Sequence, residues 1–194
     1  MGSVKYRQDV ERLFAKSAIV SNASISRIIG KKKNKNYTKR MINYLIEKNI
    51  IRRITKGYYT NKEDNLISVL CFQPAYLGLQ DALSFHNLWE QETIPVIVTS
   101  RNIRTGIRKI LKKNVMLRKI NEKYFFGYDY HQYNNIAIPY SDIEKTFIDL
   151  VYFKENIDKE VLKNIKKKIN RKKLNNYLKI YPLRFRKIIG KYWE

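Results

Sequence analysis

The chain has 194 residues, of which 44% are apolar, and its 40 Lys and Arg side chains against 17 Asp and Glu give a net charge of +23 at pH 7. This apolar fraction is enough for a folded core and excludes disorder of the whole chain, while the charge favours a polyanionic partner. A single cysteine, Cys71, excludes an internal disulfide and a cysteine-rich zinc site.

The compartment follows from the same features. No apolar stretch approaches the roughly 20 residues that cross a bilayer, and residues 1–6 lack the apolar core of a signal peptide. We therefore expect no membrane partner and a place in the reducing cytoplasm. Residues 66–100 contain no Lys or Arg, which predicts a domain boundary at about 62–66, with one domain over 1–64 and a second over 65–194.

The first two predicted elements are helices. Apolar side chains at helical spacing predict an amphipathic helix over 5–16, which serves as a scaffold. A short helix over 24–29 turns three isoleucines inward, and Gly30 can adopt the positive φ that ends it. The apolar positions of the two helices are Tyr6, Val10, Leu13, Phe14, Ile25, Ile28 and Ile29.

Residues 36–48 form the predicted recognition helix. Its apolar positions share one face, namely Met41, Ile42, Leu45 and Ile46. Arg40 and Asn43 lie on the polar side and are the best candidates to read bases, because Arg pairs with guanine and Asn with adenine through two hydrogen bonds. We expect Asn36, Tyr37 and Lys39 to contact DNA beside them.

Basic residues flank this helix on both sides. Lys31, Lys32, Lys33 and Lys35 form the preceding turn and are expected to contact phosphates, which raises affinity without base selectivity. Segments 50–54 and 58–60 have strand composition around Gly57, so a tight hairpin is predicted there. This hairpin presents Arg52, Arg53 and Lys56, and the order of elements is that of a winged helix-turn-helix, which usually binds DNA.

The second domain is predicted to mix strands and helices. A helix is expected over 77–89, followed by strands over 94–99, 115–120, 124–128 and 136–138. Residues 101–113 fit either a helix or a strand. Ser141 and Glu144 have the spacing of a capping box at the start of a helix over 142–153. Three short helices over 161–169, 174–180 and 183–189 complete the chain. The fold class is therefore α+β: an N-terminal winged helix, then a domain with a small mixed or antiparallel sheet and a helical C-terminal end.

Four short stretches resemble the AbiEi-type antitoxins, the DNA-binding partners in type IV toxin-antitoxin or abortive-infection systems. They are NII and RITKGYY at 49–51 and 53–59, YLGLQDALSFHNL at 76–88, and SDIEKTFIDL at 141–150. The resemblance implies a winged helix that represses its own operon by binding repeated promoter sequences. It also implies a C-terminal domain that counteracts a nucleotidyltransferase-like toxin, a partner that composition and periodicity do not show.

The C-terminal charge allows a further nucleic-acid contact, either with or instead of a protein partner. The residues that would meet DNA or RNA phosphates are Lys166, Lys167, Lys168, Arg171, Lys172 and Lys173. An aromatic group can stack single-stranded bases, although filling a core is favoured because aromatic residues are common in strands. Its members are Tyr124, Phe125, Phe126, Tyr128, Tyr130 and Tyr133.

No catalytic signature is present. His86 and His131 have no triad or metal spacing, and Glu144 has a structural explanation that weakens a nuclease site with Asp142 and Lys145. We expect no enzyme activity, metal or cofactor, and a sequence-specific regulator of the antitoxin type. The alternatives are an RNA-binding or nuclease component of a defence system, and a protein-binding adaptor. The operator, the toxin and the oligomeric state stay open.

Overall fold

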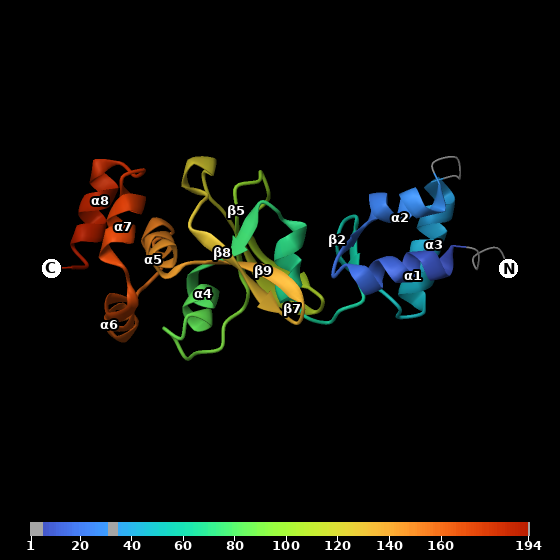
Figure 1. Ribbon diagram of the computed structural model, residues 1–194, viewed down its shortest axis with the longest axis horizontal. Coiled ribbons are helices and arrows are strands. Elements are labelled where there is room, and N and C mark those ends of the chain that lie inside the picture. The colour runs from blue at the N-terminus through green and yellow to red at the C-terminus, as the bar shows by residue number, and fades with distance from the viewer. Residues whose placement is uncertain (1–5, 31–34, 194) are drawn as a thin grey trace. The chain divides into compact units, whose positions relative to one another are not determined.

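The computed structural model describes residues 6–30 and 35–193 and shows an α+β protein with two sheets (Figure 1). The chain divides into two compact units. The first ends at Cys71 and includes Lys109–Lys113, and the second contains Phe72–Arg108 and the chain from Asn114 onward. None of the described helices has the length and apolar character that a bilayer crossing requires.

Three helices build the first unit: α1 (Arg7–Lys16), α2 (Asn22–Ile29) and α3 (Lys35–Glu47). Their apolar faces meet in one core, as the helical spacing predicts. Ile28 and Ile46 lie at its edge, partly exposed. The fully buried helical side chains of this core are Val10, Phe14, Ile25, Ile29, Met41, Ile42 and Leu45.

The ends of α2 are fixed by side-chain and glycine geometry. Ser21 is its N-cap, since the Ser21 hydroxyl accepts a hydrogen bond from the backbone N–H of Ser24 at 3.0 Å. The helix therefore begins at Asn22, two residues before the expected start. Gly30 ends it with φ at +92°, a conformation that confirms the glycine stop.

A three-stranded sheet completes the first unit, with strands β1 (Val20–Ser21), β2 (Arg52–Thr55) and β3 (Tyr58–Thr60) in the order β1-β3-β2. Both pairings are antiparallel, and the expected hairpin turns at Lys56 and Gly57, where φ of the glycine is +83°. The β1 strand was not predicted because two residues are too short for a periodic signal.

The second unit contains most of a six-stranded mixed sheet, whose strand order is β6-β7-β5-β4-β9-β8. The β4–β9 and β5–β7 pairs are parallel, whereas β4–β5 and β8–β9 are antiparallel. All four residues of β5 are buried, as the apolar run at 94–99 predicts. The strands are β4 (Ala75–Leu77), β5 (Val96–Thr99), β6 (Gly106–Ile110), β7 (Lys113–Lys119), β8 (Tyr128–Tyr133) and β9 (Ile136–Ser141).

Two local predictions in this unit were wrong. Residues 124–128 do not form a strand, because a 3₁₀ turn (Glu122–Tyr124) and a loop precede β8, which starts only at Tyr128. The helix expected over 77–89 is the shorter α4 (Leu79–Phe85), since Leu77 pairs with Ile97 as part of β4. A second 3₁₀ segment (Leu66–Cys71) precedes the sheet.

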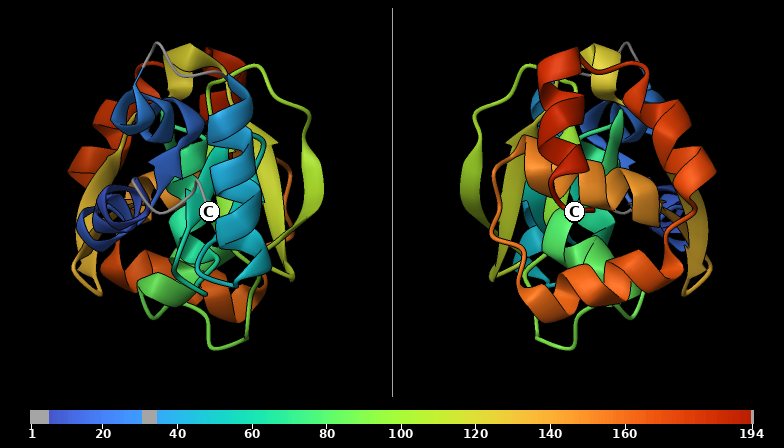
Figure 2. Two further views of the ribbon diagram at one scale, coloured as in Figure 1. Left: turned by 90° about the vertical axis from the view of Figure 1, so that its right-hand side faces the viewer. Right: turned by 90° about the vertical axis from the view of Figure 1, so that its left-hand side faces the viewer.

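Helices form the C-terminal end, with bounds close to the expected ones: α5 (Ile143–Tyr152), α6 (Lys159–Lys168), α7 (Arg171–Leu178) and α8 (Leu183–Gly190). The right panel of Figure 2 shows α5 with the other three helices around it. Phe147 and Ile148 of α5 are fully buried and share a core with Ile165 and Leu174 of the neighbouring helices. Because other elements pack around α5 on nearly every side, eight of its 10 residues are buried.

Candidate nucleic-acid interface

The outer face of α3 is a polar stripe. Asn36, Lys39, Arg40 and Asn43 are all exposed, and their spacing of three or four residues puts them on one side of the helix. The guanidinium Nε of Arg40 lies 3.4 Å from the Asn36 carbonyl oxygen, one turn earlier. Glu47 continues the stripe at its C-terminal end with a negative charge, so the cationic part is the N-terminal half of α3.

The opposite face holds the helix in place. Thr38, Met41 and Leu45 are buried, and the Leu45 carbonyl accepts hydrogen bonds from the backbone N–H groups that lead into the hairpin. Tyr37 is half-buried, with its ring edge-on to that of Tyr6 at 6.0 Å between centroids. Tyr37 therefore supports the helix more than it extends the exposed stripe.

The three hairpin residues predicted to contact DNA differ in their exposure and in their ion pairing. Arg53 and Lys56 are exposed, and neither forms an ion pair within the described parts of the chain. Arg52 is half-buried and bound to Glu63, with 2.7 Å between Nη2 and Oε1. The Gly57 carbonyl accepts from the Asn22 N–H at 2.8 Å and ties the turn to the start of α2.

The preceding turn is only partly covered by the structure. Lys31, Lys32 and Lys33, predicted to contact phosphates, lie outside the described residues, as does the side chain of Lys35 at the start of α3. Arg27 was missed by the sequence analysis. It is exposed in the last turn of α2, and the signal was its position opposite the buried Ile25 and Ile29.

The C-terminal cations divide into engaged and open groups. Lys168 donates to the carbonyls of His86 and Asn87, at 2.9 and 3.3 Å. Lys166 and Arg171 lie over the ring of Trp193, with 5.5 and 4.9 Å to its centroid, a cation–π arrangement. Lys167 of α6 and Lys172 of α7 are exposed, as expected for nucleic-acid contacts. Among the exposed cations not singled out from the sequence are Arg184 and Lys187 of α8, and Lys191 directly after it.

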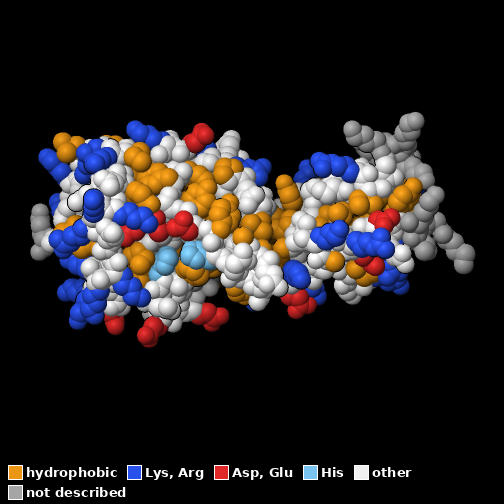
Figure 3. Space-filling view, viewed as in Figure 1, with side chains coloured by type: hydrophobic (Ala, Val, Ile, Leu, Met, Phe, Trp, Pro, Cys, Tyr) orange, Lys and Arg blue, Asp and Glu red, His pale blue; other side chains and the backbone are white. Residues whose placement is uncertain are grey.

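Figure 3 shows how these charges gather. Lys and Arg side chains crowd the end of the second unit that α6, α7 and α8 form. In that cluster Lys173 is committed to protein contacts, because its Nζ lies 3.0 Å from Asp142 and 3.5 Å from Glu144. Partial burial opposes protonation of Lys173, but the hydrogen bond and charge of Asp142 outweigh it and raise the lysine pKa.

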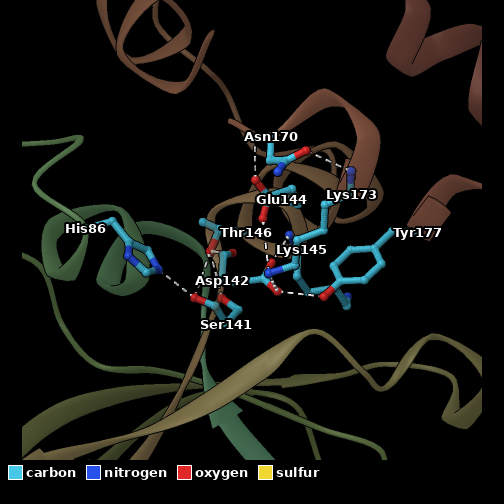
Figure 4. Close-up of polar contacts among 9 residues, drawn as sticks. All are labelled: His86, Ser141, Asp142, Glu144, Lys145, Thr146, Asn170, Lys173 and Tyr177. Carbon is cyan, nitrogen blue, oxygen red and sulfur yellow. Dashed lines mark hydrogen bonds and ion pairs between the residues drawn. The ribbon is translucent and has the colours of Figure 1, made fainter. Parts of the chain in front are cut away.

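The start of α5 departs from the predicted capping box (Figure 4). Asp142 is the N-cap, since its Oδ1 accepts from the Lys145 N–H at 2.7 Å. The Ser141 hydroxyl instead contacts that of Thr146 at 2.8 Å, inside the protein. Glu144 accepts from the Asn170 N–H at 2.7 Å, so it joins α5 to the start of α7. The capping-box assignment was therefore wrong, although a helix does begin there.

Asp142 also organises its neighbours. The Tyr177 hydroxyl donates to Asp142 Oδ2 at 2.8 Å, and burial together with this bond raises the pKa of Tyr177 to about 12. Gly127 stands beside this group with φ at +72°, and a Cβ there would lie 2.9 Å from both Lys145 and Tyr177. The cluster is thus closely packed, and its carboxylates already have protein partners.

A second polar group lies entirely inside the protein. Lys145 and Asp149 form an ion pair with both side chains fully buried, and the Tyr76 hydroxyl donates to Asp149 Oδ2 at 2.6 Å. Burial lowers the pKa of Lys145 and raises that of Asp149, while their mutual attraction works against both shifts. Without solvent access this group can organise the core but cannot reach a substrate.

The two histidines lie near each other in the second unit. His86 caps the end of α4 and its Nε2 is 2.7 Å from the Ser141 carbonyl oxygen, while His131 is part of β8. Burial lowers the pKa of His86, despite the opposing effect of the carbonyl contact. Across residues 6–30 and 35–193, no three His, Cys, Asp or Glu side chains form a group that could hold a metal ion.

Comparisons with known proteins assign no identity to this arrangement. No family model matches the chain, and no curated protein matches it.

Proposed function

We propose that this protein is a sequence-specific DNA-binding regulator of the antitoxin type, whose first unit is a winged helix-turn-helix. The observation that supports this most strongly is the exposed stripe of α3, in which Asn36, Lys39, Arg40 and Asn43 project from a helix with a buried opposite face. Arg and Asn are the residues that discriminate guanine and adenine in the major groove. The order of helices and strands supports the same proposal, because a winged helix also has a hairpin after its recognition helix.

In this proposal the parts of the first unit have separate roles. Arg40 and Asn43 read base edges, while Lys39, Arg53 and Lys56 meet phosphates and set the register on the duplex. Glu47 repels the backbone, so only the N-terminal half of α3 enters the groove. The second unit would counteract a nucleotidyltransferase-like toxin, an activity supported by the resemblance to AbiEi-type antitoxins at 76–88 and 141–150.

Fluorescence anisotropy tests the DNA part. Two labelled duplexes, one from the gene's own upstream region and one scrambled, are each titrated with the purified protein at two salt concentrations. We expect selective binding to the upstream duplex, and we expect Arg40→Ala or Asn43→Ala to reduce the preference by about 1–3 kcal/mol. Arg12→Ala is the matched control, since it removes an exposed cation from α1 of the same unit. Equal binding of both duplexes by the unaltered protein would refute sequence specificity.

A further inference from the structure

The β8 strand forms one edge of the six-stranded sheet and lacks the usual protection of such edges. Edge strands commonly carry Lys or Pro, which oppose pairing with another chain. The other edge strand, β6, follows this rule with Arg108 and Lys109, whereas β8 has three tyrosines and no Lys or Arg. Indeed, residues 124–141 contain no Lys or Arg, in a chain that has 40 of them.

Exposed aromatic side chains surround this edge. Tyr130 is 58% exposed and Tyr133 38%, on opposite faces of β8, and Phe85 of α4 is 39% exposed. Phe85 stacks on Tyr140 of β9 with ring centroids 4.0 Å apart, and the His131 ring lies 4.7 Å from Phe85. The edge therefore combines an open strand with apolar surface on both sides.

The turn after β8 determines which main-chain groups are available. Asn134 and Asn135 both have positive φ, at 46° and 61°, and join Tyr133 to its partner Ile136 in a two-residue hairpin. The closing pair of such a hairpin is hydrogen-bonded, and hydrogen-bonded pairs alternate along an antiparallel ladder. The N–H and C=O groups of Tyr128, Tyr130 and Gln132 consequently point away from β9.

We propose that a second copy of this chain pairs with β8 in the antiparallel direction, about a twofold axis at Tyr130. The outward main-chain groups of Tyr130 in the two copies then bond to each other, and Tyr128 of each copy lies opposite Gln132 of the other. The two sheets join into one continuous sheet, and the exposed tyrosine rings cover each other across the axis.

Polar complementarity favours a second copy in this register, because a carboxylate accepts a hydrogen bond from an imidazole N–H. With Tyr130 on the axis, Asp129 of each copy lies directly opposite His131 of the other, in the closely spaced pairs that are not hydrogen-bonded through the main chain. Moving the axis to His131 would set that histidine against itself and Asp129 against Tyr133, so both pairs would be lost. The register with two Asp–His pairs is therefore the selective one.

The distribution of charge supports the same place. Two chains that each carry +23 repel each other over most of their surface, and repulsion opposes association. The segment 124–141 has one charged side chain, Asp129, so two copies can approach there without bringing cations together. The dimer belongs to the second unit and does not depend on the proposed DNA binding.

Sedimentation velocity of the full chain without DNA, over a range of protein concentrations at moderate salt, tests the dimer. We expect a concentration-dependent species of twice the 23.3 kDa of one chain. Tyr130→Lys puts like charges opposite each other on the axis and should weaken dimerisation by about tenfold or more. Ile107→Lys is the matched control, since Ile107 is 60% exposed on the other edge strand and its replacement should leave the dimer unchanged.

A charge exchange tests the register. His131→Asp brings carboxylates together twice and should weaken the dimer, whereas adding Asp129→Lys to His131→Asp restores two attractive pairs and should restore association. Circular dichroism of each variant verifies folding. A chain that stays monomeric at all concentrations would overturn the proposal, even if it bound an extended peptide at β8. A dimer that tolerates Tyr130→Lys, or that is weakened equally by Ile107→Lys, would also overturn it.

Discussion

The hydroxyl of Tyr76 donates a hydrogen bond of 2.6 Å to the carboxylate of Asp149, and both side chains are fully buried. Tyr76 comes from β4 and Asp149 from α5, so the bond joins the sheet to the helical end of the second unit. Lys145 supplies the compensating positive charge from the same helix as Asp149. The polar atoms of these three side chains therefore pair with one another inside the solvent-inaccessible core.

Removal of one charge from this group should destabilise the protein strongly. Lys145→Met leaves the Asp149 carboxylate buried without its cation, and we expect a loss of about 3–5 kcal/mol in the free energy of unfolding. The combined variant Tyr76→Phe, Lys145→Met and Asp149→Leu has no unpaired polar group and should lose less than Lys145→Met alone. Urea denaturation followed by circular dichroism measures both, and a triple variant less stable than the single one would contradict this account.

His86 should make stability depend on pH. Its pKa in the folded protein lies below the ordinary value of 6.5, so the unfolded chain binds more protons in that range. The stabilisation from neutral His86 is therefore present above about pH 6.5 and is lost as the pH falls through the folded pKa. Thermal melting at pH 7.5 and 5.5 should show this loss, and His86→Gln should reduce it.

His131→Gln is the comparison for that measurement. It removes the other histidine but leaves His86 buried, and burial is the main cause of its lowered pKa, so the decline in stability on acidification should remain. A decline of equal size in the unaltered protein and in His86→Gln would show that a different group is responsible.

The hairpin of the first unit should affect DNA binding through charge alone. Each phosphate neutralised contributes about 0.9 to the slope of log K against log salt, so Lys56→Ala should reduce that slope by about this amount. Arg52→Ala should change it less, because Glu63 holds Arg52 at 2.7 Å. Binding to a duplex at four salt concentrations gives the slopes, and a larger change for Arg52→Ala would argue against the assignment of contacts to the hairpin.

The first unit was largely predictable from the sequence because its periodicity is local. Met41, Ile42 and Leu45 recur at helical spacing and are buried, and Gly57 marks a turn in which both neighbours are strands. The roles of Arg40 and Asn43 follow from their exposure and remain predictions. What the sequence could not show was the two-residue strand at Val20, which depends on pairing with Tyr59, far along the chain.

The second unit was harder to predict because tertiary contacts decide its details. The β8 strand lies at an edge of the sheet and none of its residues is fully buried, so it lacks the alternation of buried and exposed residues that marks a half-buried strand. Lys145 and Asp149 are four residues apart, a spacing that usually indicates a surface ion pair, yet both are inaccessible. Glu144 matched a capping box in the sequence, but its carboxylate reaches α7 instead.

The position of Cys71 gives the protein a built-in reporter of local opening. It is the single cysteine, it is buried, and burial raises the pKa of its thiol to about 12, so almost none of it is the reactive thiolate at neutral pH. A thiol reagent therefore reacts with the folded chain only when the segment around Cys71 transiently opens. The labelling rate therefore measures how often this segment opens, and Cys71 is the residue at which the chain passes from the first unit to the second.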